Sequence, residues 1–194
     1  MIQIAKEADS PALAAIYGWY VENTAVSFEY EAPSPAEFAG RIREILCTHP
    51  FLVYEENGEL LGYAYAHPLI RRKACDWAVE VSIYIRRDVR GKGIGKALYE
   101  ALENALRMQN ICTLEACVAS ADMLDEYLTD DSVRFHKRMG YTQEGKMTDC
   151  GYKFGRWYHL LWLEKHILPR NKNIGNMRKF PEIQREYAEK YGIK

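Results

Sequence analysis

The stretch EVSIYIRRDVRGKGIGKALYEAL, residues 80–102, decides the fold of this chain. Apolar residues recur at every second position up to Ile85, which predicts a β-strand over about residues 77–85. A basic turn that contains three glycines follows. Beyond it, apolar residues return at the spacing of one helical face, at Ile94, Ala97, Leu98, Ala101, Leu102 and Ala105. The stretch therefore predicts a strand, a glycine-rich turn and a long helix in succession.

The turn matches neither of two familiar phosphate-binding motifs. A P-loop requires G-x-x-x-x-G-K-[ST], but Gly95 and Lys96 are followed by Ala97, and Arg90 stands where the first glycine belongs. A dinucleotide fingerprint requires G-x-G-x-x-G, but Lys96 and Leu98 occupy the places of the third glycine. The failed P-loop pattern excludes a nucleotide kinase.

The turn nevertheless has three properties that favour a pyrophosphate. Its glycines permit unusual backbone angles, so that several N–H groups can converge on one anion. The helix that begins near Ile94 adds the positive end of its dipole. Basic side chains add charge. An anion site is predicted here, with a plain strand–helix turn as the alternative, and its residues are Arg90, Gly91, Lys92, Gly93, Ile94, Gly95 and Lys96.

The bulk properties exclude several other classes of protein. The chain has 194 residues, enough for one well-cored domain, and a formal net charge of -1, which argues against nucleic acid or an anionic membrane as partner. No apolar run reaches membrane-spanning length, and the N-terminus lacks signal-peptide features, so we expect a cytoplasmic protein. The five cysteines form no C-x-x-C pair and the histidines no ligand spacing, so free thiols and no metal are expected.

The rest of the chain alternates between helices and strands. A helix is predicted from Ser10, as N-cap, to about Val21, and a second one at SPAEFAGRIREIL, where Ser34 and Glu37 form a capping box. Asn57-Gly58 predicts a type I′ hairpin. A strand at ICTLEACVA, a short helix over residues 132–139 and a strand at RWYHLLWLEK follow. This order predicts an α/β (mixed α+β) single domain around one sheet.

The character of the sequence changes after residue 168. PRNKNIGN reads as a polar linker, and FPEIQREYAEKYG as a short charged helix. We therefore divide the chain into a main domain, residues 1–168, and a C-terminal linker and helix, residues 169–194. The appendage packs on the domain or on a second subunit, or is a loosely docked tail.

The glycine turn also carries a family resemblance. VRGKGIGKAL after SIYI resembles the acetyl-CoA pyrophosphate loop of the GCN5-related N-acetyltransferases (GNAT). TAVSFEYEAPSPAEF, HPFLVYEENGELLGYAYAHP, ACDWAVEVSIYI, DSVRFHKRMGY and GYKFGRWYHLLW resemble, in the same order, segments of phosphinothricin and methionine sulfoximine acetyltransferases. The likeness covers about residues 1–165. It implies a central, mixed, splayed sheet flanked by helices, and acetyl-CoA as co-substrate.

The resemblance also implies which residues bind acetyl-CoA. Ile83, Tyr84 and Ile85 match the splayed strand whose backbone pairs with the pantetheine arm, and the glycine turn matches the pyrophosphate site. Thr129 and Ser132 fall where the family contacts the cofactor. The similar proteins usually carry asparagine in place of Thr129 and often proline in place of Asp131, so this chain departs from the family pattern at the Thr129 contact.

Two residues are predicted to handle protons. Acetylating an amine requires a neutral nitrogen, and a nearby carboxylate can take the proton. Glu80 matches the acidic residue of the family and is out of place in the apolar strand AVEVSIYI, where burial would raise its pKa; a solvent-facing glutamate is the alternative. His136 stands where many such enzymes place a tyrosine that protonates the CoA thiolate; a surface or capping histidine is the alternative.

The acceptor side is implied by RRKACDW, which resembles the substrate loop of the family. Arg72 is the best candidate to pair with an acceptor carboxylate, with Lys73 and Cys75 in the same pocket. Phe28 is a candidate apolar wall. His159 stands where several relatives carry an aspartate, a departure that bears on acceptor specificity and on dimer contacts.

Together these residues predict an enzyme that transfers acetyl from acetyl-CoA to the primary amine of a small amino acid or analogue, similar to phosphinothricin or methionine sulfoximine, directly in a ternary complex. The subfamily also implies a homodimer. The alternatives are acetylation of a polyamine or a protein N-terminus, or a non-catalytic acetyl-CoA-binding module.

Overall fold

The computed structural model describes residues 1–169 and 174–193, so part of the predicted linker, residues 170–173, and Lys194 lie outside the described residues. Its elements, in chain order, are β1 (Ile2–Ile4), η1 (Glu7–Asp9), α1 (Ser10–Asn23), α2 (Pro35–Leu46), β2 (Phe51–Glu56), β3 (Glu59–Pro68), η2 (Lys73–Cys75), β4 (Ala78–Ile85), η3 (Arg87–Val89), α3 (Ile94–Met108), β5 (Thr113–Ser120), α4 (Asp131–Arg138), β6 (Thr142–Lys153), β7 (Arg156–His166) and α5 (Phe180–Tyr191).

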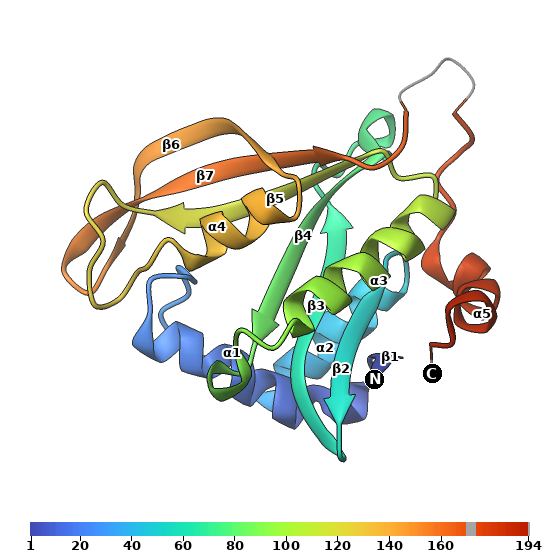
Figure 1. Ribbon diagram of the computed structural model, residues 1–194, viewed down its shortest axis with the longest axis horizontal. Helices are drawn as coiled ribbons and strands as arrows, with labels where there is room; N and C mark the ends of the chain where they lie inside the picture. The colour runs from blue at the N-terminus through green and yellow to red at the C-terminus, as the bar shows by residue number, and fades with distance from the viewer. Residues whose placement is uncertain (170–173, 194) are drawn as a thin grey trace.

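The strands form one mixed sheet of order β1-β2-β3-β4-β5-β7-β6. Only β4 and β5 run parallel, and they separate from each other along the sheet (Figure 1). Helices α1 and α2 cover one face of the β2–β4 half, and α3 covers the other (Figure 1). The mixed α/β fold around a single splayed sheet, predicted from the sequence, is confirmed.

The alternating pattern of the strands divides the core into two layers. Val79 and Val81 of β4 face α3, whose predicted apolar stripe is buried at Ile94, Leu98, Leu102 and Ala105. On the opposite face, aromatic side chains of β2 and β3 pack against α1 and α2. Because the strand period is two, each alternate residue of β4 is directed to one layer or the other. Glu80 therefore belongs to the face opposite α3.

Two local features confirm the expected signals, and two differ from them. Asn57 and Gly58 have φ values of 54° and 83°, as a type I′ turn requires, and Ser34 Oγ accepts a hydrogen bond from the N–H of Glu37 at 3.2 Å. However, the Glu37 carboxylate pairs with Arg41 instead of completing a capping box. Ser10 is not an N-cap, because η1 runs directly into α1 and the backbone of Ser10 is already helical.

One strand, β6, was missed by the sequence analysis. It contains Gly145 and Gly151 and is mostly exposed, so it shows no apolar alternation. Its pairing with β7 shifts register twice, between Gln143 and Gly145 and between Met147 and Gly151. Without a buried face, the segment carries no period that indicates a strand.

The C-terminal helix α5 packs beside α3 (Figure 1). Phe180, Ile183 and Tyr187 are fully buried, and the Tyr187 hydroxyl donates to the Ala101 carbonyl at 2.9 Å. Trp77, at the start of β4, donates its indole N–H to the Gly175 carbonyl at 2.8 Å. The appendage is thus part of the same core, which decides between the alternatives left open by the sequence.

Candidate active site

The site begins where β4 and β5 separate. The two strands pair only over Ala78–Glu80 and Thr113–Glu115. Beyond these pairs β4 continues to Ile85 with β3 on one edge, and among the described residues no strand pairs with its other edge. Half of the backbone N–H and C=O groups of residues 82–85 therefore point away from β3. Of these, the Ile85 carbonyl accepts a hydrogen bond from the Tyr20 hydroxyl at 2.5 Å, and the others remain available for an extended ligand. This geometry supports the prediction that Ile83, Tyr84 and Ile85 contact a bound molecule through their backbone.

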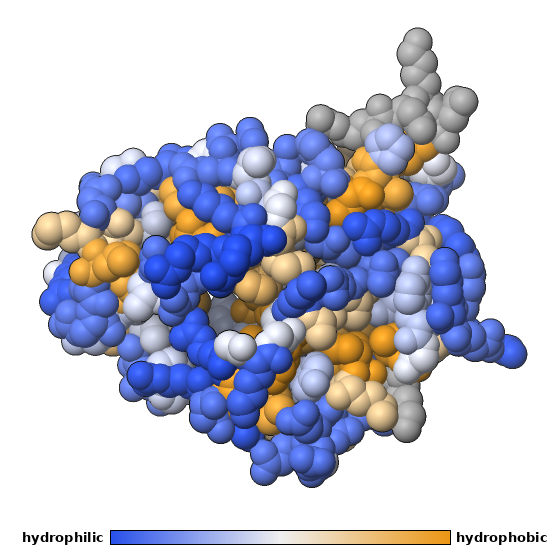
Figure 2. Space-filling view, in the orientation of Figure 1, coloured by the Kyte–Doolittle hydropathy of each residue, from blue (hydrophilic) through white to orange (hydrophobic). Residues whose placement is uncertain are grey.

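A cleft fills the space between the separating strands. Its lining includes Ile83, Tyr84, Tyr99, Cys117, Ser132 and His136, from β4, α3, β5 and α4. Figure 2 shows a hollow between α4 and the start of α3, with hydrophilic residues around it. The predicted cofactor strand and the short helix after the sheet thus face one another across a single opening.

The glycine turn lies at the N-terminus of α3. Gly91 and Gly93 have φ values of 80° and 83°, in the left-handed region, and a Cβ at either position would meet no described atom within 4 Å. Their space is therefore open, and only the backbone angle requires glycine. Lys92 is exposed, and Lys96 lies 3.7 Å from Glu100. The turn has the shape and charge that an anion site needs.

Gly95 has a different reason to be glycine. A Cβ at Gly95 would lie 3.1 Å from the ring of Phe135 on α4. The residue thus allows α3 and α4 to approach closely, and its predicted contact with a phosphate is not needed to explain it. Arg90 reaches the start of α4 as well, with its guanidinium 3.4 Å from the Asp131 carboxylate.

At the start of α4, the structure treats the two predicted cofactor-binding residues, Thr129 and Ser132, differently. The Thr129 hydroxyl donates to Asp131 at 3.0 Å, and Asp131 also pairs with Arg134 at 2.6 Å. Ser132, in contrast, lines the cleft. Of the two predicted cofactor contacts on this segment, Ser132 faces the opening, whereas the Thr129 hydroxyl is engaged by its neighbour.

His136 is buried, and both of its ring nitrogens have partners. Nδ1 lies 2.8 Å from the Ser132 carbonyl, which only accepts, so Nδ1 carries the proton and donates it. Nε2 therefore accepts from the Tyr99 hydroxyl at 2.9 Å. Burial lowers the pKa of His136 to about 4. A neutral ring whose two nitrogens both have hydrogen-bond partners is better suited to orienting the Tyr99 hydroxyl than to donating a proton. The catalytic role of His136 stays a prediction.

Glu80 lies at the point of separation, opposite His67 on β3 and Glu115 on β5. Its side chain is 24% exposed, and its Oε2 lies 3.8 Å from His67 Nε2. Burial raises the pKa of Glu80, although His67 acts in the opposite direction. Burial, together with the Glu80 carboxylate, raises the pKa of the neighbouring Cys117 thiol to about 12, so that this cysteine stays protonated.

The loop between β3 and β4 carries the predicted acceptor residues. Arg72 is exposed and donates to the Arg71 carbonyl at 3.1 Å. Lys73 is 93% exposed and pairs with Asp76 at 2.8 Å, and Cys75 is half-buried. The positions of Arg72, Lys73 and Cys75 leave their contact with an acceptor a prediction.

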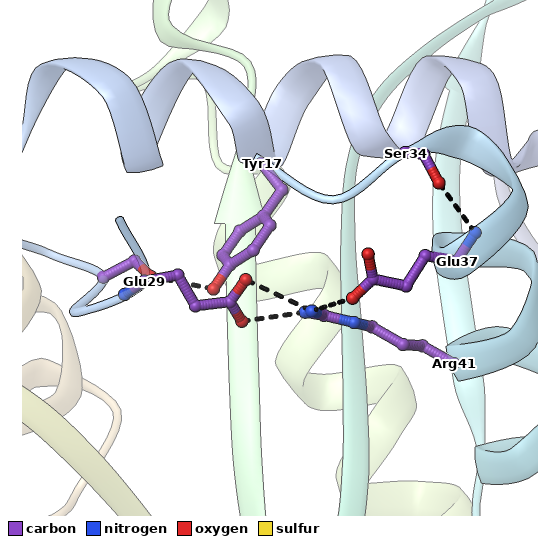
Figure 3. Close-up of polar contacts among 6 residues, drawn as sticks. Tyr17, Glu29, Ser34, Glu37 and Arg41 are labelled. Carbon is purple, nitrogen blue, oxygen red and sulfur yellow. Dashed lines mark hydrogen bonds and ion pairs between the residues drawn. The ribbon is translucent and has the colours of Figure 1, made fainter. Parts of the chain in front are cut away.

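Phe28 lies in the loop between α1 and α2, which is fixed by a polar cluster. Arg41 of α2 donates to both carboxylate oxygens of Glu29, at 2.9 and 3.1 Å, and to Glu37 at 2.8 Å (Figure 3). The Tyr17 hydroxyl lies 2.8 Å from Ser27 Oγ. A bidentate arginine–carboxylate pair holds a loop more firmly than a single contact. The ring of Phe28 lies directly over Gly151 of β6, where a Cβ would overlap it at 2.1 Å.

A buried lysine anchors the same loop from β6. Lys153 Nζ donates to the carbonyls of Val21 and Ser27, at 2.7 Å each, and burial lowers its pKa. These two bonds tie the end of α1 and the segment that precedes Phe28 to the sheet. Sequence analysis missed Lys153, because its strand gave no pattern.

Replacing Lys153 should weaken the binding of the acceptor and leave the binding of acetyl-CoA unchanged. Lys153→Met removes both donors from buried carbonyls, so we expect unfolding to become easier by about 1–3 kcal/mol. The displaced Phe28 loop should raise the KM of the acceptor about tenfold, with the KM of acetyl-CoA unchanged. Steady-state kinetics with each substrate varied in turn measure this. Lys146→Met, which removes an exposed β6 pair with Asp122, is the control. Equal changes in both KM values would contradict the assignment.

His159, at the departure from the family pattern, is buried on β7. Its Nδ1 accepts the Asp149 N–H at 3.0 Å, and its Nε2 lies 3.2 Å from Asp122. It is thus held between two loops. Cys47, Cys75, Cys117 and Cys150 are free thiols. Within residues 1–169 and 174–193, no group of three or more His, Cys, Asp or Glu could hold a metal, and no helix is long and apolar enough to cross a membrane.

Comparison with known proteins agrees with this geometry. The model of the Acetyltransferase (GNAT) domain matches residues 2–162. The phosphinothricin N-acetyltransferase of Streptomyces viridochromogenes is 32% identical over 87% of this chain and 88% of its own. The L-methionine sulfoximine/L-methionine sulfone acetyltransferase of Pseudomonas aeruginosa is 33% identical over 87% of this chain and 95% of its own.

A solved structure shows the same arrangement. A phosphinothricin acetyltransferase from Sinorhizobium meliloti, crystallised in complex with acetyl-CoA, superimposes with a TM-score of 0.79 at 29% identity, over 90% of this chain and 94% of its own. The resemblance drawn from the sequence motifs is confirmed over most of the chain.

Proposed function

This chain belongs to the GNAT family of N-acetyltransferases, and from that membership we propose that it acetylates the primary amine of a small amino acid or analogue, with acetyl-CoA as donor. The observation that carries the proposal is the position of Glu80. A carboxylate whose pKa is raised by burial stands at the point where β4 and β5 separate, directly before Val81 and Ser82, which line the cleft. A proton acceptor and a donor-binding edge are thus brought together.

Each part of the cleft has a place in binding acetyl-CoA. The backbone of Ile83–Ile85 would pair with the pantetheine arm, and the turn with Gly91 and Gly93 would hold the pyrophosphate at the N-terminus of α3. Arg90 and Lys92 add positive charge there. Acetyl-CoA supplies an activated acyl group as a thioester. Related N-acetyltransferases, one of them crystallised in complex with acetyl-CoA, support this assignment.

The chain itself contributes orientation and proton transfer. The nitrogen lone pair of the acceptor forms a bond to the thioester carbonyl carbon, and the C–S bond breaks, so that the CoA thiolate leaves and takes up a proton from water. The proton released from the amine passes to the Glu80 carboxylate and from there to solvent. Holding both substrates in one cleft removes much of the entropic cost of the reaction, about 7–11 kcal/mol in the best cases. His136 and Tyr99 line the far side of the cleft and fix its shape.

A homodimer is part of the proposal. The outer strands β6 and β7 expose Met147, Tyr152 and Trp157, the last at 60%. Tyr152 and Trp157 lie together, with ring centres 5.0 Å apart, and apolar side chains that are exposed as a patch mark protein contacts. The division into residues 1–168 and 169–194 also stays a proposal, with α5 packed on the main domain.

The experiment that tests the function is release of free thiol from acetyl-CoA by the purified protein. The acceptors are phosphinothricin, methionine sulfoximine and natural amino acids, with spermidine and an N-terminal peptide for the alternatives. We expect turnover with an amino acid and without any added protein. Tight binding of acetyl-CoA with no turnover on any amine would contradict the proposed acetyltransferase activity and favour a non-catalytic acetyl-CoA-binding module. Faster turnover of spermidine or the peptide would overturn the acceptor class.

A further inference from the structure

A second, larger cavity lies on the sheet face that α1 and α2 cover. Its volume is about 570 Å³, within the range of small-molecule sites. The floor consists of three stacked rings from β2 and β3: the Phe51 ring lies 5.5 Å from that of Tyr63 and 5.0 Å from that of Tyr65. Phe38 and Ile45 of α2 form the opposite wall. The cavity is thus an aromatic slot, and the donor-binding features described above do not use it.

The slot adjoins the proposed transfer centre. His67 lines it, and His67 Nε2 lies 3.8 Å from Glu80 Oε2. The ring of Tyr63, in its floor, lies 5.5 Å from that of Tyr84, which lines the cleft between β4 and β5. The two cavities therefore share an aromatic wall, with His67 and Glu80 at its edge. A molecule whose amine reaches Glu80 can extend into the slot past His67.

The rim of the slot carries an arginine, Arg71, that can form an ion pair with a ligand. Arg71 lines the cavity and pairs with Glu44, also of the lining, at 2.9 Å, with side chains 81% and 70% exposed. An exposed pair of this kind is weak and easily exchanged. An acceptor carboxylate can replace Glu44 as partner of Arg71. Arg41, in contrast, is committed to Glu29 and Glu37 and contributes mainly its apolar stem.

We propose that this slot binds the side chain of the acceptor, so that the chain prefers α-amino acids with large apolar or aromatic side chains. The inference rests on the proposed function. The acceptor amine lies at Glu80 and His67, its carboxylate at Arg71, and its side chain over the Phe51–Tyr65 stack. Phe51 and Tyr63 are buried already, so a ligand would cover mainly the half-buried lining of Ile45, Tyr65 and Pro68. A short polar side chain would leave that apolar lining in contact with water. Phenylalanine should therefore exceed alanine in kcat/KM by about tenfold or more.

The first test blocks the mouth of the slot. Cys47 lines it and is exposed, so Cys47→Phe places a ring in the opening at little risk to the fold. We expect the preference for phenylalanine over alanine to shrink to about twofold in this variant, because the slot is filled. Arg43→Phe is the matched control: Arg43 lies on α2, is exposed, and pairs with Glu7 away from the slot. It should leave the preference intact.

The second test detects binding without turnover. Iodoacetamide alkylates exposed thiols, and mass spectrometry of peptides separates Cys47 from Cys150, which is exposed elsewhere. Phenylalanine should protect Cys47 and leave Cys150 unprotected. Acetylation of phosphinothricin, with neither protection of Cys47 nor a preference for phenylalanine, would overturn the inference and leave the proposed function standing. If no amino acid is acetylated, the proposed function fails, and the alkylation result alone decides whether the slot binds amino acids.

Discussion

Glu80→Gln lowers kcat/KM for the amino-acid acceptor by about 10²–10⁴-fold, the usual contribution of a general base. The variant keeps the shape of the side chain but cannot take a proton. The affinity for acetyl-CoA should not change, because the proposed donor contacts lie on the backbone from Ile83 onward and in the glycine turn. Thiol release at saturating acetyl-CoA, together with a direct binding measurement, separates the two effects. Loss of acetyl-CoA binding would show that Glu80 is structural.

The pH dependence gives a second signature of the base. The active form of Glu80 is the carboxylate, which is present above its pKa. Since burial raises this pKa, the acid limb of the kcat/KM profile should lie above the range near pH 4 where an ordinary glutamate titrates. The limb should vanish in Glu80→Gln. A raised pKa of a carboxyl group also means that stability is lost as pH rises, so this variant should be no less stable than the native chain at pH 8.

Glu115→Gln is a matched control for this experiment. Glu115 is the register partner of Glu80 on β5, and burial, with help from Glu164, raises its pKa to about 7. It is thus a second titrating carboxylate on the same sheet face, next to Glu80. We expect kcat to stay within about threefold of the native value and the acid limb to keep its position, because burial and His67, not Glu115, set the pKa of Glu80. A loss as large as that of Glu80→Gln would show that the two carboxylates act as one proton acceptor.

Much of the donor side could be predicted from the sequence, because its signals are local. The strand that ends at Ile85, the left-handed glycines and the apolar stripe of α3 are all encoded within residues 80–102. Backbone angle, helix period and dipole act over a few residues, so the order of residues is enough. The out-of-place Glu80 could also be found this way, since a charged residue interrupts an apolar strand.

The acceptor side depends on long-range pairing, which the sequence does not state. His67 faces Glu80 only because β3 and β4 pair in one register across the loop of residues 69–77. The stacked rings of Phe51 and Tyr65 meet through the register of β2 and β3. Lys153 reaches Ser27 across 126 positions of the chain. A shift of one residue in any of these pairs would turn the side chains to the other face, so only the folded structure identifies them.

Gly93→Val should raise the KM of acetyl-CoA about 10- to 100-fold, the loss expected when a charge-assisted hydrogen bond to the pyrophosphate is removed. Gly93 is the N-cap of α3 at φ 83°, where a β-branched residue is strained. A Cβ there meets no described atom within 4 Å, so the new side chain itself has room in the protein. The higher KM of acetyl-CoA must therefore come from the altered direction of the N–H groups and from crowding of the ligand.

Gly58→Val provides the comparison that isolates this effect. Gly58 has the same φ of 83° and the same open surroundings, but it lies in the hairpin between β2 and β3. Both variants should lose about 1–2 kcal/mol of stability from left-handed strain. Only Gly93→Val should weaken the binding of acetyl-CoA, which isothermal titration calorimetry would measure. If both variants weaken acetyl-CoA binding to the same extent, strain transmitted through the sheet is the cause of the loss. A change confined to Gly93 assigns the three-glycine turn to the pyrophosphate, since strain, exposure and substitution are otherwise equal.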